Sequence, residues 1–411
     1  MNDLRCRSCE TPLKQSFVDL GMSPLANSYL KCEELNRMEA FYPLHAYVCE
    51  KCLLVQVPKC ESPERIFSDY AYFSSYSDTW LEHVEAYSAK VIERFGLNAN
   101  SLVVEIACND GCLLQCFKKS GIPVLGVEPA RNVAQVASNA GIPIEVMFLS
   151  VEAATELAAE GKQADLLIAN NVMAHVPDLN DFIGGMKIVL KPEGIITIEF
   201  THLQRMMEGN QFDSIYHEHF SYFSLITAEK VLKKHGLTIF DVEKIPTHGG
   251  SLRLFVCHTG NSSRPVGQRV IKLRAAEVNS GFIRLERYLS FAKAVQGTKY
   301  SILEFFVGAK RQRKTIAAYG APAKGNTLLN YCGIRADFVD YTVDRSPHKQ
   351  GLFLPGTHIP IFPPTKIKET RPDYLLILPW NLKDEIMQQM AFIRDWGGQF
   401  VTLIPEVTTY A

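Results

Sequence analysis

One seven-residue stretch of the chain concentrates groups that can move protons. It reads Tyr216-His217-Glu218-His219-Phe220-Ser221-Tyr222 and holds two histidines, a carboxylate and two phenols. An imidazole titrates near neutral pH, and a neighbouring carboxylate can raise its basicity, so the stretch suits general acid–base chemistry. Two alternatives are open. One is a polar turn whose histidines only hydrogen-bond, and the other is a metal site, if an extended backbone puts His217 and His219 on one face.

Two cysteine pairs near the N-terminus have the spacing of metal ligands. Cys6 and Cys9 form one Cys-x-x-Cys pair, and Cys49 and Cys52 form a second, about forty residues later. Two such pairs can converge on one ion and complete a tetrahedral four-sulfur zinc site with no open position. We therefore expect one structural zinc ion per chain, in a module that spans residues 1–65. The alternative is two unrelated pairs of buried or redox-active cysteines.

The composition is ordinary for a soluble globular protein. A length of 411 residues allows two or three domains, and 47% hydrophobic with 21% charged residues is ordinary for a globular chain. A net charge of -1 argues against a surface that coats nucleic acid. No apolar run follows Met1, and the eleven cysteines are scattered, so we expect a cytoplasmic protein with no membrane segment.

From about residue 100 the sequence alternates between strand and helix patterns. A buried strand at 101–107 runs into a tight turn at 108–111, which opens a helix at 112–119. The next strand, 124–129, contains Glu128, about twenty residues past the turn, where a carboxylate can bind the hydroxyls of a ribose. These features predict a parallel α/β domain, placed at residues 66–245, that holds a nucleoside-containing cofactor.

The order of these elements resembles the class I S-adenosylmethionine-dependent methyltransferases. The match continues through a strand at 164–171, the turn Leu190-Lys191-Pro192-Glu193-Gly194 and a strand at 195–200, although the usual glycine-rich loop is reduced to residues 105–111. An NAD site is disfavoured because no Gly-x-Gly-x-x-Gly follows a strand, whereas acidic Glu105 fits a cationic cofactor. The resemblance implies an S-adenosyl-L-methionine site formed by Glu105, Ala107, Asn109, Asp110, Gly111, Glu128, Pro129 and Asn170.

Taken together, the motifs are similar to those of a narrower family, the C-methyltransferases that act on nucleotide-linked 4-keto-deoxysugars. The resemblance rests on the order of the cysteine module, 105–111, 171–178, 216–222, 248–253, 319–327, 344–351 and 354–360. It covers nearly the whole chain. It implies three parts: an N-terminal zinc-binding module, a class I methyltransferase domain and a C-terminal C-methyltransferase domain.

The chemistry of that family explains which residue types are needed. A carbon beside a ketone must lose a proton before the resulting enolate can attack the methyl group of S-adenosylmethionine, so a base and a group that stabilises the enolate oxygen are required. The resemblance implies that His219 is the general base, with Glu218 and Tyr216 orienting it or contacting the sugar. His175 is expected to donate to the keto oxygen or to carry a second proton, and Asn171 to contact the substrate.

An aromatic stretch at 69–76 lies at the start of the cofactor domain, before its first predicted strand. Tyr70 and Tyr72 in this stretch are expected to form a lid, with Tyr70 in the catalytic set and Tyr72 against the substrate; packing in the core is an equal alternative. Tyr222 is expected to contact the substrate as well.

The C-terminal part, 246–411, has strand patterns at 314–320, 338–344 and 374–379. They predict a second doubly wound α/β domain, joined to the first by helices at 265–310. The turn at 320–325 lacks the order of a P-loop, yet Lys324, Asn326 and Lys349 could hold a pyrophosphate between the two domains. The alternative is that these lysines lie on a surface turn.

The sequence thus predicts an α/β enzyme with two Rossmann-like domains and a small zinc module. The expected substrate is a dTDP-linked 4-keto-6-deoxysugar, with GDP and CDP as other carriers, methylated at C-3 or alternatively at C-5. Rival functions are O- or N-methylation of a small molecule and methylation of nucleic acid bound by the zinc module. We expect a monomer that binds neither nucleic acid nor membranes.

Overall fold

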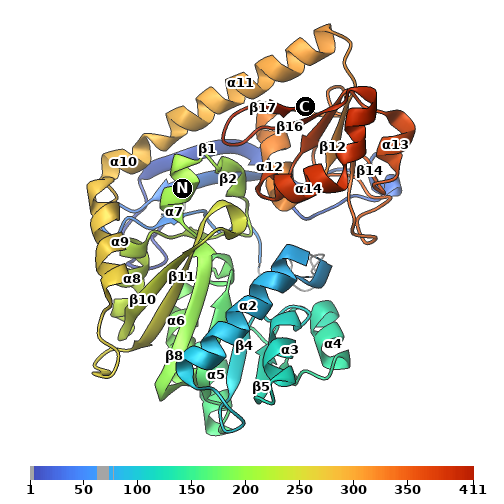
Figure 1. Cartoon of the computed structure of the whole chain (residues 1–411). Coiled ribbons are helices and arrows are strands. Elements are labelled where there is room, and N and C mark those ends of the chain that lie inside the picture. The colour runs from blue at the N-terminus through green and yellow to red at the C-terminus, as the bar shows by residue number, and fades with distance from the viewer. Residues whose placement is uncertain (1–3, 63–73, 77) are drawn as a thin grey trace.

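The computed structural model describes residues 4–62, 74–76 and 78–411. Its strands form three sheets, which correspond to the zinc module and the two α/β domains expected from the sequence. In Figure 1 the N-terminal strands lie between the two α/β domains, and the long helix α11 (Phe291–Arg311) runs along the outside from one domain to the other. The predicted fold class is confirmed.

The smallest sheet is antiparallel and belongs to the N-terminal module. Its order is β1-β2-β3-β9, with β1 Gln15–Ser23, β2 Tyr42–Val48, β3 Val55–Gln56 and β9 Ser221–Tyr222. A single 3-10 turn, η1 Cys32–Glu34, lies between β1 and β2. Because β9 comes from the proton-moving stretch, the module expected at 1–65 is completed by residues far downstream.

The middle sheet has seven strands in the order β10-β11-β8-β7-β4-β5-β6. Its strands are β4 Val103–Ile106, β5 Val124–Val127, β6 Ile144–Glu145, β7 Ala164–Asn170, β8 Leu190–Thr201, β10 Leu237–Ile245 and β11 Ser251–His258. The central pairs are parallel, and β11 runs antiparallel to both of its neighbours. The domain boundary proposed at 245/246 falls between β10 and β11, so this sheet extends to His258.

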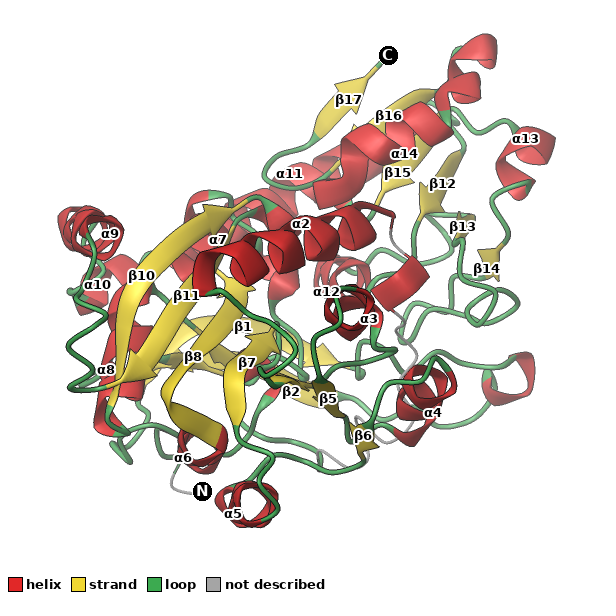
Figure 2. Cartoon of the chain, turned by 60° about the horizontal axis from the view of Figure 1, so that its bottom comes forward, coloured by secondary structure: helices red, strands yellow, loops and turns green. Residues whose placement is uncertain are grey.

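Helices cover both faces of the middle sheet (Figure 2). Their bounds are α2 Asp78–Phe95, α3 Cys112–Lys119, α4 Arg131–Asn139, α5 Val151–Ala159, α6 Leu179–Val189, α7 Leu203–Glu208 and α8 Leu225–Lys234. One apolar cluster joins the sheet to α2, α3 and α4, and another joins the opposite face to α5, α6 and α8. Short 3-10 turns, η2 Ser74–Tyr76, η3 Met173–His175, η4 Phe212–Ser214 and η5 Thr247–Gly249, lie in the connections.

The turn predicted at 191–194 is part of β8 instead. The β7–β8 register shifts between Ala164 and Leu166, which accommodates the extra residues as a bulge. Gly194 is suited to this bulge because a Cβ there would lie 2.7 Å from the carbonyl oxygen of Ala164.

Three helices lead to the C-terminal domain: α9 Gln268–Asn279, α10 Leu285–Leu289 and α11. The sheet that follows has the order β14-β13-β12-β15-β16-β17, parallel except for β17. Its elements are β12 Ile316–Tyr319, α12 Ala323–Cys332, β13 Tyr341–Val343, β14 Ile361–Phe362, α13 Lys366–Thr370, β15 Tyr374–Ile377, η6 Trp380–Leu382, α14 Lys383–Gln389, η7 Ala391–Trp396, β16 Gln399–Thr402 and β17 Thr408–Tyr410. The strand order reverses between β12 and β15, where ligands of doubly wound sheets bind.

None of the described helices combines the length and the apolar character needed to cross a lipid bilayer.

Candidate active site

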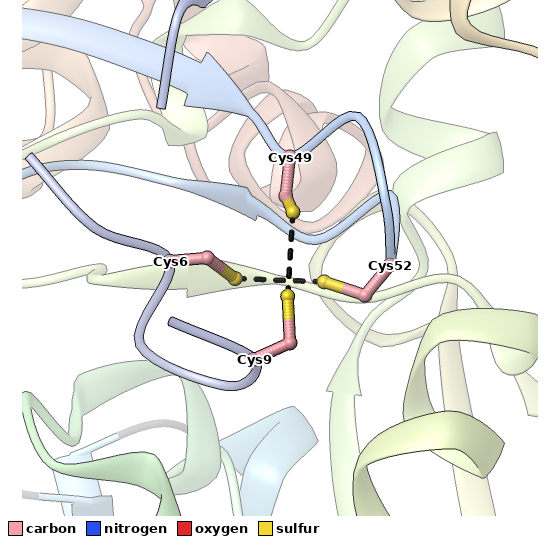
Figure 3. Close-up of side chains that lie close together, drawn as sticks. All are labelled: Cys6, Cys9, Cys49 and Cys52. Carbon is pink, nitrogen blue, oxygen red and sulfur yellow. Dashed lines mark hydrogen bonds between the residues drawn. The ribbon is translucent and has the colours of Figure 1, made fainter. Parts of the chain in front are cut away.

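The four predicted metal ligands converge on one point (Figure 3). The Sγ atoms of Cys6, Cys9, Cys49 and Cys52 all lie within 4.8 Å of one another, and the Cys6–Cys52 and Cys9–Cys49 pairs are each 3.5 Å apart. A tetrahedron with Zn–S bonds of about 2.3 Å requires sulfurs about 3.8 Å apart. Four thiols at this spacing, supplied by two short turns, fit a closed structural zinc site.

The loop after β4 adopts a glycine-like conformation with few glycines. The φ angles of Ala107, Asn109 and Gly111 are 56°, 52° and 76°, so alternate residues are left-handed. Such a conformation costs a non-glycine residue about 1 kcal/mol or more. The sequence had suggested a reduced glycine motif, but the backbone shape that a glycine-rich loop would adopt is retained.

Carboxylates surround this loop. Glu105, Asp110 and Glu128 are each at most 6% exposed, and Glu128 accepts hydrogen bonds from the amides of Asn109 and Ala130, at 2.9 Å each. Burial raises the pKa of Glu105 well above its ordinary value, and the charges of Asp110, Glu128 and Glu199 raise it further. A cation bound here would relieve that repulsion.

The donors and acceptors of this pocket fit S-adenosyl-L-methionine. Oε2 of Glu105 and both polar side-chain atoms of Asn170 are buried and make no hydrogen bond with the part of the chain that is described. The sulfonium and ammonium groups of this cofactor would pair with the carboxylates. Its hydroxyls, or another hydrogen-bonding group, would pair with the side-chain amide of Asn170.

A buried ion-pair network lies beside this pocket and was not anticipated. Glu199 of β8 is fully buried, accepts from Nε of Arg253 at 2.5 Å, and lies 3.1 Å from Nε2 of His83. Burial alone would raise the pKa of Glu199, but hydrogen bonding by His83 and the charge of Arg253 lower it overall. Arg253 also reaches Glu243 at 3.3 Å, so the network ties α2 to strands β8, β10 and β11.

His219 is held in a defined tautomer. The stretch 216–219 forms a turn, closed by a 2.9 Å bond from the His219 amide to the Tyr216 carbonyl, rather than an extended segment. Nδ1 of His219 lies 2.8 Å from the carbonyl oxygen of Ser214 and must carry the proton, so Nε2 accepts from the Tyr216 hydroxyl at 2.7 Å. Burial lowers the pKa of His219 well below its ordinary value, and nearby His175 lowers it further. The ring is therefore neutral at pH 7.

The neighbours of His219 in sequence face other partners. Oε2 of Glu218 accepts a hydrogen bond from Nδ2 of Asn27 at 2.6 Å. This bond points Glu218 towards the N-terminal module and does not orient His219. Burial raises the pKa of Glu218 to about 7. His217 packs edge-on against Tyr42 with ring centroids 5.9 Å apart. Since His217 and His219 point to different partners, a metal site shared by the two is not formed.

His175 and Asn171 reach the same centre from the loop after β7. The rings of His175 and His219 are 4.6 Å apart at 71°, and burial lowers the pKa of His175 to about 4. Asn171 has a φ of 54° and lines a cavity of ≈ 30 Å³ together with His219 and Tyr222. A cavity of this size can hold an ordered water, and the buried hydroxyls of Ser221 and Tyr222 lack hydrogen-bond partners among the described residues.

Lys324 approaches this centre from the C-terminal domain. It lies at the start of α12, next to the reversal of strand order, donates to Oδ1 of Asn381 at 3.0 Å, and lies 4.6 Å above the Trp380 ring. Burial lowers its pKa, and its charge helps to lower the pKa values of His219 and His248. Thus Lys324 is half-buried against Trp380 and is not a fully exposed side chain of a surface turn.

Trp380 joins the two α/β domains beside Lys324. Its Nε1 donates to Oδ2 of Asp213 at 2.7 Å, and burial raises the pKa of Asp213 to about 6. The Trp380 ring packs on Gly249, where a Cβ would lie 2.4 Å from a ring carbon. This contact therefore depends on glycine at position 249.

The other two predicted substrate contacts lie nearer the N-terminal module. Nζ of Lys349 donates to the carbonyl of Ala321 at 2.9 Å and lies 5.2 Å above the Tyr29 ring. Nδ2 of Asn326 donates to the carbonyl of Ala26 at 2.6 Å, and the residue is 1% exposed. Tyr70 and Tyr72 lie outside the described residues.

Sequence comparison identifies the relatives of this chain. Three family profiles match: a zinc binding domain at residues 6–67, a methyltransferase domain at 80–242 and a C-methyltransferase C-terminal domain at 246–405. The C-methyltransferase NovU of Streptomyces niveus is 34% identical over 401 residues, which are 98% of this chain and 95% of the relative. The chain belongs to this C-methyltransferase family.

Other proteins are similar to part of this chain only. The ubiquinone biosynthesis O-methyltransferase of Bartonella tribocorum is 31% identical over 103 residues, 24% of this C-methyltransferase and 40% of the relative. Among solved structures, the PH0226 protein of Pyrococcus horikoshii is 18% identical with a TM-score of 0.38, and covers 48% of this chain and 98% of its own. Magnesium protoporphyrin IX methyltransferase of Synechocystis, solved with bound SAM, is 16% identical with a TM-score of 0.34, and covers 48% and 89%.

Several residues of this S-adenosylmethionine-dependent C-methyltransferase escaped sequence reasoning. Asp213 and Trp380 carry no local motif, and the carbonyl of Ser214 has no sequence signal at all. Arg253 did stand in the motif 248–253, and a buried arginine in a strand pattern is a signal for an acidic partner.

Proposed function

We propose that the chain methylates a carbon atom beside the ketone of a nucleotide-linked 4-keto-deoxysugar, at C-3 in preference to C-5. The observation that carries the proposal is the setting of His219: a neutral, half-buried imidazole with a fixed tautomer, 4.6 Å from His175 and within the field of Lys324. A neutral base and a nearby cation are what removal of a proton beside a ketone requires, since negative charge then builds on the keto oxygen. Transfer to a hydroxyl would need no base at carbon.

The proton route follows from the hydrogen bonds of His219. Because Tyr216 donates to Nε2, the proton can pass from the sugar carbon to the Tyr216 oxygen while the Tyr216 proton moves to His219. The alternative is that Tyr216 turns away and Nε2 takes the proton directly. In both cases His219 becomes an imidazolium, whose Nδ1 keeps its bond to Ser214 and whose charge is balanced by the enolate.

His175 is assigned to the keto oxygen. It is neutral at pH 7 and can donate a hydrogen bond, while the charge of Lys324, which is assigned to the phosphates, acts on this centre from the opposite domain. Tyr222 and Asn171, which line the cavity behind His219, are assigned to the sugar ring together with Glu218.

The phosphates are assigned to the carboxyl edge of the C-terminal sheet. Lys349 follows β13, and Lys324 with the start of α12 follows β12, so two cations and helix amides face the point where strand order reverses. Asn326 is assigned a supporting role, because its amide holds Ala26 of the N-terminal module. We propose thymidine diphosphate as the carrier.

Cofactor binding is assigned to Glu105, Ala107, Asn109, Asp110, Gly111, Glu128, Pro129 and Asn170. When bound, S-adenosyl-L-methionine would supply an electrophilic methyl group on a sulfonium. Glu105 and Asp110 would hold its positive charges, and Glu128 would accept from its ribose hydroxyls. We also propose that Cys6, Cys9, Cys49 and Cys52 hold one zinc ion and that the enzyme is a cytoplasmic monomer.

Incubation with S-adenosylmethionine and a dTDP-4-keto-6-deoxysugar tests the proposal. Mass spectrometry should find one added methyl group, and NMR should locate it on carbon. In deuterated solvent, the wild-type enzyme should exchange hydrogen at that carbon, and His219→Asn should reduce transfer by about 10²–10⁴-fold with cofactor binding retained. A methyl group on oxygen, or normal turnover by His219→Asn, would contradict the proposal.

Tyr216→Phe separates the two proton routes. A relayed route predicts that this variant loses deuterium exchange as fully as His219→Asn does. A direct route predicts that exchange persists in Tyr216→Phe, because Nε2 is then exposed to the substrate.

A further inference from the structure

We propose that Arg7, inside the first cysteine pair, is a positioning residue that fixes the two catalytic loops relative to each other. This inference rests on the proposed roles of His175 and His219. Arg7 lies between two of the predicted zinc ligands, Cys6 and Cys9. The zinc module would thereby take part in the reaction geometry, in addition to folding the N-terminus.

The guanidinium of Arg7 contacts both loops at once. One terminal nitrogen donates to the carbonyl of Pro177 at 2.9 Å, two residues after His175. The ring of Phe220, directly after His219, lies 5.3 Å from the guanidinium carbon. The planar fork of an arginine can hold two such groups at a fixed separation, which a lysine cannot do.

The second terminal nitrogen strengthens the link to the His219 loop. It donates to the carbonyl of Val57 at 2.6 Å, and the amide of Val57 in turn donates to the carbonyl of Phe220 at 3.0 Å. Val57 directly follows β3, which pairs with β9. Arg7 therefore sits at the junction of the loop 171–178 and the segment 219–222.

The cysteine site and its neighbours immobilise the backbone of Arg7. Its amide donates to Oε1 of Gln56 at 2.9 Å, while Nε2 of Gln56 lies 3.3 Å from Sγ of Cys6. Gln56 is 1% exposed and pairs with Ser221 across the β3–β9 ladder. The carbonyl of Arg7 accepts from Nδ2 of Asn180 at 2.9 Å, just beyond the His175 loop. The hydrogen bonds and ring contact described for Arg7 thus connect it either to the cysteine site or to a catalytic loop.

Small displacements of the two loops should affect the rate. A misplacement of about 1 Å at a reacting group can reduce a rate about 10²-fold, and residues that support metal or catalytic groups typically contribute about 10–100-fold. His175 and His219 must face the same substrate carbon and oxygen, so their separation matters more than the position of either alone.

Three variants test the proposal in the zinc-loaded enzyme. Arg7→Met keeps an unbranched aliphatic side chain and removes the donors, Arg7→Lys keeps the charge, and Arg5→Met is the matched control. Arg5 is exposed, belongs to the same segment, and donates to the carbonyl of Glu10 at 3.2 Å. Zinc content and the melting temperature are measured for each.

We expect Arg7→Met to lower kcat by about 10–100-fold. Zinc content and the affinity for S-adenosylmethionine should match those of Arg5→Met, and Arg7→Lys should recover part of the rate. Amide hydrogen exchange should speed up in peptides covering 171–178 and 216–223, and not in those covering β4 and β5.

Two results would overturn the proposal. One is a kcat of Arg7→Met equal to that of Arg5→Met. The other is faster exchange spread over the whole chain, with the lost rate explained by the unfolded fraction. If the wild-type enzyme does not methylate the sugar nucleotide, the proposed function fails, whereas the exchange pattern still decides whether Arg7 holds the two loops.

Discussion

Glu218 should make the stability of this protein depend on pH in an unusual direction. Burial raises its pKa from an ordinary 4.5 to about 7, although the Asn27 amide and the Lys349 charge oppose this. Between pH 4.5 and 7 the folded chain keeps a proton on Glu218 that the unfolded chain has lost. The contribution of Glu218 to the free energy of unfolding is therefore fully present below pH 4.5 and is lost as pH rises through 7. A separation of about 2.5 pH units corresponds to roughly 3 kcal/mol in the free energy of unfolding.

Glu218→Gln should remove this dependence. Glutamine keeps an oxygen that can accept from Asn27 and does not titrate, so the variant should gain up to roughly 3 kcal/mol relative to wild type between pH 4.5 and 8. Urea midpoints at four pH values measure the difference. Glu208→Gln, at an exposed carboxylate in α7, is the matched control.

The wild-type profile alone would hide the effect. Burial lowers the pKa values of His175 and His248 to about 4, so their contribution to the free energy of unfolding decreases as pH falls below 6.5. Glu218 and Asp213, whose pKa is raised to about 6, have the opposite dependence on pH. The contributions of these two histidines and two carboxyl groups to the free energy of unfolding therefore nearly cancel between pH 4.5 and 6. A difference between Glu218→Gln and wild type that does not change with pH would refute the reasoning.

Three further predictions concern metal, cofactor and stability. Cys49→Ser should lower the zinc content, measured by elemental analysis, from about one per chain towards zero, because one of four thiolates is lost. Glu105→Gln should weaken S-adenosylmethionine binding by about tenfold in a calorimetric titration, since one charged partner is removed. Arg253→Met should lower the urea-derived free energy of unfolding by about 3–5 kcal/mol, because it leaves Glu199 buried without its main cation; an unchanged midpoint would show that His83 suffices.

Local patterns were enough to predict the cluster of four cysteines and the parallel strands of the middle sheet. A Cys-x-x-Cys pair brings two sulfur atoms together within one turn, so its geometry follows from the sequence alone. The helix predicted at 112–119 coincides with α3, because its apolar positions repeat at helical spacing. The left-handed Ala107 and Asn109 could not be read from residue type, since neither is a glycine.

Contacts between distant segments were beyond sequence reasoning. Glu218 was expected to orient His219 or to contact the sugar, and its hydrogen-bond partner Asn27, 191 positions away, could not be named from the sequence. His83 and Glu199 are 116 positions apart. A single sequence shows which side chains need partners, but only the packed fold decides which distant segment supplies them.

The pairing of β3 with β9 bears on how the chain assembles while it is being made. Gln56 must wait for Ser221, about 165 residues later, before the N-terminal sheet has its fourth strand. At about 5–20 residues per second, the ribosome takes roughly 10–30 s to supply it. The N-terminal sheet can therefore reach its final form only after β9 has been synthesised, and a nascent chain stalled before residue 221 would carry a zinc module with an unpaired strand.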